Sequence, residues 1–233
     1  MSVDTHRVLM GACGWNHQAW LDDFYSDDLP EDWRLGYYSN EFPMIYVPAG
    51  DWLDGIDSDK EGLSEWTEDV ADSFRFILEI SADILENEQR FDAALEKAKE
   101  LEDFCLGLVL QLNPSICSDS VLFQQRIDKA VAISAVCVDG QGNILSDELQ
   151  KILKNKNISE VWDGKSSETE SCVRGSLAIT HISSDELDIA TLRRVVEHCL
   201  SASNEECTSV LCLDGNPPSL ELLRNADVIL NLL

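Results

Sequence analysis

The chain has 233 residues, 44% of them hydrophobic, which suits one α/β barrel and is enough to bury a large core. Its formal net charge of −27, from 44 acidic against 17 basic residues, argues against binding to nucleic-acid phosphates or to anionic membranes. No apolar run approaches the roughly 18 residues of a membrane span, and no secretory signal is recognised, so we expect a cytoplasmic protein. Its partners are then expected to be a small molecule or a basic protein.

Short apolar runs recur along the chain and predict strands that are buried on both faces. In chain order they lie at 7–12, 44–47, 74–80, 107–112, 131–138, 160–162, 177–182 and 210–213.

Helical patterns fall between these runs. Apolar residues repeat at intervals of three and four over 91–105 and again over 192–200, which is typical of an amphipathic helix. Asp147 is predicted to cap another helix, and Ser183 with Glu186 to form a capping box for the 192–200 helix.

The alternation of strands and helices indicates βαβ units and a mainly parallel sheet. Eight strand candidates favour a closed TIM (β/α)8-like barrel, irregular or reduced in places, over a doubly wound open sheet. We see neither an internal repeat nor an interdomain linker, and therefore expect a single domain over 1–233.

Polar residues at strand ends are the candidates for chemistry. His181 lies near the end of the seventh predicted strand, and Asp139, Asp163 and Asp214 each follow an apolar run. Two or three such carboxylates with His181 could bind a divalent metal through oxygen and nitrogen. The alternative is that each Asp caps a helix or forms a turn.

Aromatic side chains are concentrated after the first two predicted strands. Trp15, Trp20 and the Phe24-Tyr25 pair follow the first strand, and Trp52 follows the second. They could stack a planar or sugar-like ligand, or they could pack the core of an irregular loop.

The same stretch carries a resemblance to a known family. Gly11 to Trp20 followed by Phe24-Tyr25 has a Gly-Trp pair, a second Trp and a Phe-Tyr pair; further matches lie at Trp66, Phe74-Arg75-Phe76, Leu110 to Pro114 and Asn225-Ala226. In this order and spacing they resemble the YecE-like family, a domain of unknown function. The resemblance implies a TIM-barrel-like fold and adds Gln111 and Asn113, at the fourth strand end, to the pocket.

Several charged positions depart from the family pattern. Tyr46 stands where the resemblance implies Glu, and Glu79 where it implies Lys. The Glu-x-Arg of the fifth strand has no clear counterpart, and only His181 remains of the seventh strand's Arg-x-His. Loss of Lys and Arg would remove the positive charge that could hold an anionic substrate.

Two hypotheses for function follow. The first is a binding or regulatory barrel that has lost the family's charged pocket residues. The alternative is a metal-assisted hydrolase, or another small-molecule enzyme, that uses His181 with Asp163 or Asp214 at the C-terminal face. Convergence of those side chains within about 5 Å would favour the alternative. Because strand eight pairs with strand one in a barrel, one depression is expected to gather the pocket residues. These are Trp15, His17, Trp20, Trp52, His181 and Asp214, and Gln111 and Asn113 are further candidates for the ligand pocket.

Overall fold

Parallel strands alternate with helices throughout the computed structural model, which describes residues 8–21, 23–54, 62–164 and 174–233. The strands are β1 Val8–Ala12, β2 Met44–Val47, β3 Arg75–Ile80, β4 Cys105–Gln111, β5 Ala135–Asp139, β6 Ser159–Glu160, β7 Leu177–Ser183 and β8 Thr208–Asp214. They form two parallel sheets, one in the order β1-β8-β7 and one in the order β2-β3-β4-β5-β6.

Isolated parallel bridges connect the two sheets at both junctions. Cys13 bridges to Tyr46 between β1 and β2, and Trp162 bridges to Thr180 between β6 and β7. The Gly14 N–H donates to the Tyr46 carbonyl at 2.8 Å, and the His181 N–H donates to the Trp162 carbonyl at 2.9 Å. The chain therefore has the expected α/β, barrel-like strand order, with β8 against β1 and two weak seams.

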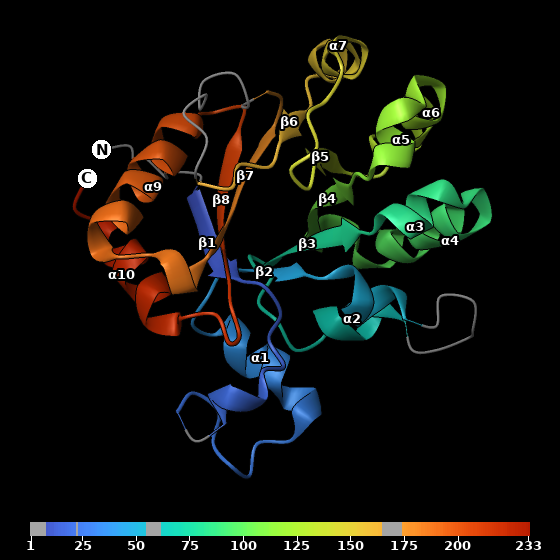
Figure 1. Cartoon of the computed structure of the whole chain (residues 1–233). Helices are drawn as coiled ribbons and strands as arrows, with labels where there is room; N and C mark the ends of the chain where they lie inside the picture. The colour runs from blue at the N-terminus through green and yellow to red at the C-terminus, as the bar shows by residue number, and fades with distance from the viewer. Residues whose placement is uncertain (1–7, 22, 55–61, 165–173) are drawn as a thin grey trace.

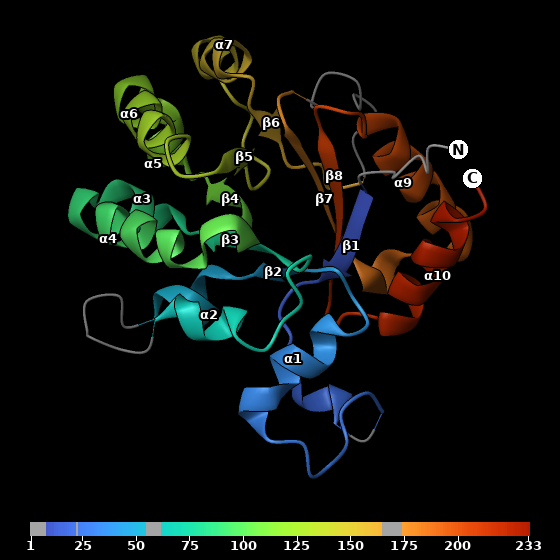
Figure 2. The same cartoon turned by 180° about the vertical axis from the view of Figure 1, so that it is seen from behind.

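Helices flank the strands on opposite sides. In Figures 1 and 2, α9 and α10 lie on one side of the strands and α3 to α7 on the other, with α1 beyond the end of β1. The bounds are α1 Arg34–Ser39, α2 Ala49–Leu53, α3 Ala82–Glu86, α4 Glu88–Ala98, α5 Pro114–Ser118, α6 Ser120–Ala130, α7 Asp147–Lys156, α9 Ile189–Ala202 and α10 Leu220–Leu230. Short 3-10 helices are η1 Gln18–Trp20, η2 Glu31–Trp33, η3 Leu63–Thr67, η4 Lys99–Phe104 and η5 Ser184–Glu186.

Two apolar clusters account for most of the core. The larger fills the space between strands and helices and includes the buried stripe Phe91, Ala94, Leu95 and Ala98 of α4. The smaller is built largely from alternate strand positions, as expected of barrel-interior side chains. Its buried members are Cys13, Met44, Tyr46, Ile77, Val109, Cys137, Leu177, Ile179, Val210 and Cys212.

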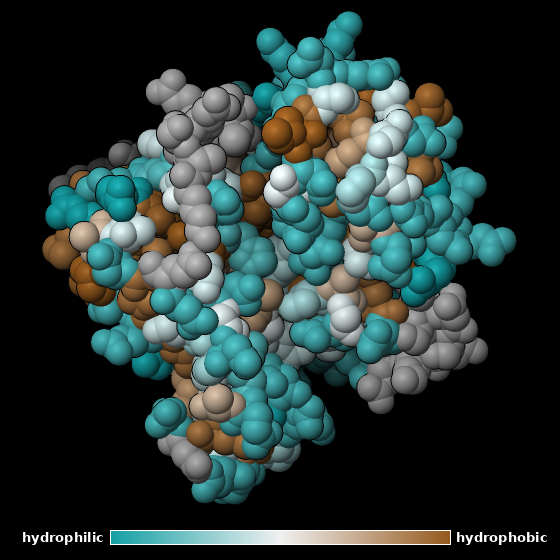
Figure 3. Space-filling view, viewed as in Figure 1, coloured by the Kyte–Doolittle hydropathy of each residue, from teal (hydrophilic) through white to brown (hydrophobic). Residues whose placement is uncertain are grey.

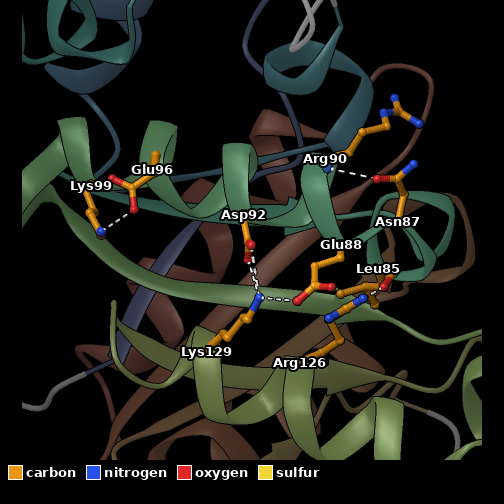
Figure 4. Close-up of polar contacts among 9 residues, drawn as sticks. All are labelled: Leu85, Asn87, Glu88, Arg90, Asp92, Glu96, Lys99, Arg126 and Lys129. Atoms are coloured by element: carbon orange, nitrogen blue, oxygen red, sulfur yellow. Dashed lines mark hydrogen bonds and ion pairs between the residues drawn. The ribbon is translucent and has the colours of Figure 1, made fainter.

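Polar contacts join α6 to α3, which contains Leu85, and to α4 (Figure 4). Lys129 of α6 donates to Glu88 at 2.9 Å and to Asp92 at 2.7 Å, both on α4. The buried Arg126 donates from Nε to the Leu85 carbonyl at 2.7 Å. The exposed Lys129 pairs are expected to stabilise little, whereas loss of Arg126 would leave a buried carbonyl without its donor.

Predicted and observed strand ends differ by one or two residues in most places, and the fifth and sixth strands illustrate the reason. The segment 131–134 is a turn after α6, with the Ile133 N–H bonded to the Ala130 carbonyl, so β5 begins at Ala135. The sixth strand covers only Ser159–Glu160, and Trp162 contributes an isolated bridge. In both places the apolar run extends beyond the residues that pair as a continuous strand.

Three predicted helix boundaries are corrected. The 91–105 stripe is divided, because α4 ends at Ala98 and η4 follows with Glu102 at φ 46°. Ser146, not Asp147, caps α7 by accepting from the Leu149 N–H. Ser183 caps η5, and α9 is capped by Asp188, whose side chain accepts from the Thr191 N–H at 2.7 Å. At both capping sites, residue types that can cap a helix lie within a few positions of one another, and sequence alone does not show which of them forms the cap.

The surface is largely hydrophilic on the face drawn in Figure 3, while hydrophobic side chains gather over α9 and α10. Ile189 of α9 and Val228 of α10 are 54% and 56% exposed. Within the described ranges, every helix is too short or too polar to cross a membrane.

Candidate functional site

Three donor side chains converge where β1, β7 and β8 end. Cys13 directly follows β1, His181 lies in β7 and Asp214 is the last residue of β8. The strand register pairs Ala12 with Leu213 and His181 with Cys212, so Cys13, His181 and Asp214 lie within two residues of one level on neighbouring strands. One ligating atom from each lies within 4.8 Å of the other two. The separation between His181 Nε2 and Asp214 Oδ2 is 3.8 Å, so the predicted pair meets the 5 Å criterion.

Tyr46 and Glu79 form the adjoining wall of this cluster. The Tyr46 ring centroid is 4.7 Å from that of His181. Its hydroxyl donates to Glu79 Oε2 at 2.7 Å, and the Ala49 N–H donates to Glu79 Oε1 at 3.1 Å. Burial, together with the charge of Glu79, raises the pKa of Tyr46 well above its usual value, so it acts as a neutral donor. The two positions that depart from the family pattern therefore bind each other.

Residues of this cluster shift the pKa values of Cys13 and His181. A hydrogen bond from Cys212 is the largest cause that lowers the pKa of Cys13, and His181 adds to it against the effect of burial. Burial acts to lower the pKa of His181, but the neighbouring Cys13 thiol and the charges of Asp214 and Glu79 leave it raised. Thiolate and imidazolium character thus favour each other at this site.

A cleft of about 1020 Å³ opens beside the cluster. It is lined by Gly14, Trp15, Asn16, His17, Glu31, Asp32, Leu35, Asp51, Glu65, Trp66, Glu68 and Asp69. The rings of Trp15 and Trp66 meet edge to face, with centroids 5.0 Å apart and an interplanar angle of 81°. The formally charged side chains among these lining residues are all carboxylates.

The turn after β1 places this cleft next to the donor cluster. Gly14 has φ 72°, a left-handed conformation that suits glycine, and it redirects the chain immediately after Cys13. His17 Nε2 donates to the Cys13 carbonyl at 2.8 Å, and the Tyr25 hydroxyl donates to the Trp15 carbonyl at 2.7 Å. The predicted residues Trp15 and His17 both line the cleft.

Trp20 and Trp52 do not line this cleft. They are 4% and 2% exposed and belong to the larger core cluster. Trp20 Nε1 donates to the Pro218 carbonyl at 3.2 Å, and Trp52 Nε1 donates to the Glu79 carbonyl at 2.7 Å. These two indoles therefore pack in the core behind the site. Sequence alone did not show this, because an aromatic residue that follows a strand can face either the core or the cleft.

The other residues predicted for the site are not lining residues of this cleft. Gln111 is half-buried at the end of β4, paired in register with Asp139. Asn113 caps α5: its side chain accepts from the Ile116 N–H and donates to Glu86 Oε1, both at 2.9 Å. Asp163 is exposed, and it is not among the three converging donors.

Cys13 and Trp66 are the site residues that sequence reasoning missed. Cys13 and Trp66 entered the sequence analysis only as part of the family resemblance. Alternation in the strands carries the signal for Cys13, because Cys13, His181 and Asp214 follow Gly11, Ile179 and Cys212 at a spacing of two.

Parallel strands in chain order, flanked by helices and carrying reactive side chains at their C-terminal ends, define a barrel-type α/β protein. The profile of a family described as "Protein of unknown function DUF72" matches residues 9–162, more than half of the chain. The chain belongs to the DUF72 family. No curated protein matches it.

Solved structures of the same family are similar over almost the whole chain. A DUF72 protein from Enterococcus faecalis has a TM-score of 0.68 at 14% identity, with 97% of this chain and 96% of that chain covered. A DUF72 protein from Thermotoga maritima has a TM-score of 0.62 at 12% identity, with 97% and 99% covered. Identities this low show a shared fold.

Proposed function

We propose that this protein is a binding barrel whose cleft takes a small organic cation of the polyamine or quaternary ammonium class. The observation that carries the proposal is the Trp15–Trp66 pair, with centroids 5.0 Å apart, inside a cleft of about 1020 Å³. The carboxylates among its lining residues are Glu31, Asp32, Asp51, Glu65, Glu68 and Asp69.

The chemistry of the lining supports a cation over an anion. Aromatic faces attract ammonium groups through the ring quadrupole, and a concave acidic surface raises the local concentration of cations. The volume is comparable with that of clefts that hold small organic ligands. Glu79, where the resemblance implies Lys, removes a positive charge from the neighbouring mouth of the barrel.

Metal-assisted hydrolysis is a second candidate function, favoured by the 3.8 Å between His181 Nε2 and Asp214 Oδ2. Asp163, the other carboxylate proposed from sequence, does not join them.

We infer further that the chain is a YecE-like member, supported by the opening Gly-Trp and Phe-Tyr motifs. A single domain over 1–233 is supported by strands that alternate with helices to the end of the chain. A cytoplasmic location is supported by burial of Cys137, Cys199 and Cys212 in the core, where a free thiol packs as a small hydrophobe; Cys172 lies outside the described residues.

Calorimetric titration of the full chain with spermidine, and separately with choline, tests the cation proposal. We expect one site per chain near physiological salt. Trp66→Ala should weaken binding by roughly 2- to 30-fold, the range for a cation–π contact. Trp33→Ala is the matched control, because Trp33 is 64% exposed and is not a lining residue of this cleft.

Non-specific attraction to an acidic chain would give neither a single site nor a dependence on Trp66. Equal affinities for the wild-type chain and Trp66→Ala would overturn the proposal. Saturable binding of a lysine-rich peptide, with no binding of either small cation, would replace it with a basic protein partner.

A further inference from the structure

We infer that Cys13, His181 and Asp214 form a three-ligand zinc site with an open fourth position. The inference goes beyond cation binding in the cleft and does not depend on it. It deepens the second candidate function, because it names the metal and adds a ligand that sequence reasoning did not include.

The geometry is close to that of a tetrahedral site. Zinc bonds of about 2.0–2.3 Å separate ligand atoms by roughly 3.3–3.8 Å. His181 Nε2 and Asp214 Oδ2 are already 3.8 Å apart, and the Cys13 donor lies within 4.8 Å of both partner donors. The Asp214 side chain is 53% exposed, so it has room to turn toward a shared ion without moving the strand.

His181 supplies an independent indication of a ligand. Its Nε2 is buried, and no hydrogen-bond partner for it is found in the described part of the chain. A buried nitrogen without a partner is costly, and coordination would satisfy it. The His181 side chain as a whole is 17% exposed, but Nε2 itself is buried. Asp214 Oδ2, at 3.8 Å, is too far from Nε2 for a hydrogen bond.

The surroundings orient two of the three ligands. The Gly215 N–H donates to Asp214 Oδ1 at 2.7 Å, which leaves Oδ2, the oxygen nearer His181, for a metal. Tyr46 packs against the His181 ring and is held by its hydrogen bond to Glu79. Supporting contacts of this kind orient ligands in metal sites.

The donor set identifies the metal class. A thiolate with an imidazole and a carboxylate selects zinc or a similar thiophilic ion over magnesium or calcium, which prefer oxygen alone. Three protein ligands with the fourth position free for water or substrate are the pattern of catalytic zinc.

The experiment titrates zinc into the chelator-treated full chain in competition with a chromophoric chelator, and repeats the titration with cobalt(II). We expect one equivalent of zinc and a cobalt spectrum with a thiolate charge-transfer band. Cys13→Ser, His181→Gln and Asp214→Asn should each lower zinc affinity by at least about 100-fold, the upper end of the loss caused by an outer-shell change. Cys117→Ser, a half-buried thiol on α5, should bind like the wild-type chain.

Cys13→Ser should also remove the charge-transfer band. Unchanged zinc affinity in Cys13→Ser or Asp214→Asn, or cobalt binding without the band in the wild-type chain, would overturn the site. Circular dichroism of each variant without zinc monitors folding, and the half-exposed Asp214→Asn decides the matter if His181→Gln does not fold. Spermidine binding, which depends on Trp66, is measured separately, so the two proposals can fail independently.

Discussion

Tyr46 and Glu79 show how single side chains set the chemistry of the barrel mouth. Tyr46 is fully buried, whereas Glu79 is half-buried, and the hydroxyl and carboxylate lie 2.7 Å apart. A hydrogen bond to a charged acceptor stabilises more than a neutral one. Beside His181, Tyr46 therefore acts as a neutral hydrogen-bond donor and Glu79 as its carboxylate acceptor.

We predict that Tyr46→Phe lowers the free energy of unfolding by about 1.5–3 kcal/mol, the range for a hydrogen bond to a charged group. A double-mutant cycle with Glu79→Gln, measured by urea unfolding, should show coupling between the two positions. Tyr37→Phe, at a 46% exposed tyrosine, should change stability by less than about 0.5 kcal/mol. Strict additivity in the cycle would show that the bond is not formed.

Alternation along the strands places Cys13 on the same face as His181 and Asp214, but it does not separate a ligand from a packed thiol, because a buried free cysteine also behaves as a small hydrophobe. His181 and Asp214 were singled out because they end predicted strands, and the C-terminal ends of barrel strands are where barrel enzymes do chemistry. Their contact with Cys13 depends on strand register, which pairs Ala12 with Leu213 and which no local pattern specifies. Trp20 and Trp52 were assigned to the pocket although they lie in the core, because sequence does not show whether an aromatic residue after a strand faces the core or the cleft.

At the scale of elements, the close approach of β1 and β2 depends on Gly11. A Cβ atom there would lie 2.1 Å from the Met44 carbonyl oxygen, a backbone atom that cannot rotate away. We predict that Gly11→Ala lowers the thermal midpoint markedly. Gly50→Ala is the control: nothing lies within 4 Å of its Cβ position in α2, so it should be neutral or stabilise by up to about 1 kcal/mol. Equal melting of the two variants would contradict this packing.

Asn113 gives a second test of an element boundary. Its side chain caps α5 through the Ile116 N–H. Asn113→Ala should cost about 1 kcal/mol in urea unfolding, while Asn113→Ser, which keeps a capping oxygen, should cost much less. If both variants match the wild-type chain in stability but weaken spermidine binding, Asn113 belongs to the ligand pocket, as predicted from sequence, and does not stabilise α5.

All eight predicted strand runs correspond to strands or bridges in the described part of the chain, because buried parallel strands are continuously apolar. The errors lie at the ends, as in 131–134, where the same residue types pack in a turn after α6. Helix starts failed where Ser183 and Asp188 compete as caps, and only the tertiary path between β7 and α9 decides between them.

At the scale of the whole molecule, the net charge of −27 opposes folding through self-repulsion and attracts cations. Added sodium chloride should therefore raise the thermal midpoint and, in the same buffers, weaken spermidine binding, because both effects are screened. Scanning calorimetry and titration over a salt series measure the two trends. Spermidine affinity that does not change with salt would contradict an electrostatic cleft.

The most direct test of the account is a crystal structure of the full chain with spermidine. We predict an amine nitrogen within about 6 Å of the ring centroid of Trp15 or Trp66, with carboxylates of the cleft around the remaining amines. Spermidine bound only at other acidic surfaces, with the Trp15–Trp66 cleft free of it, would contradict the proposed function.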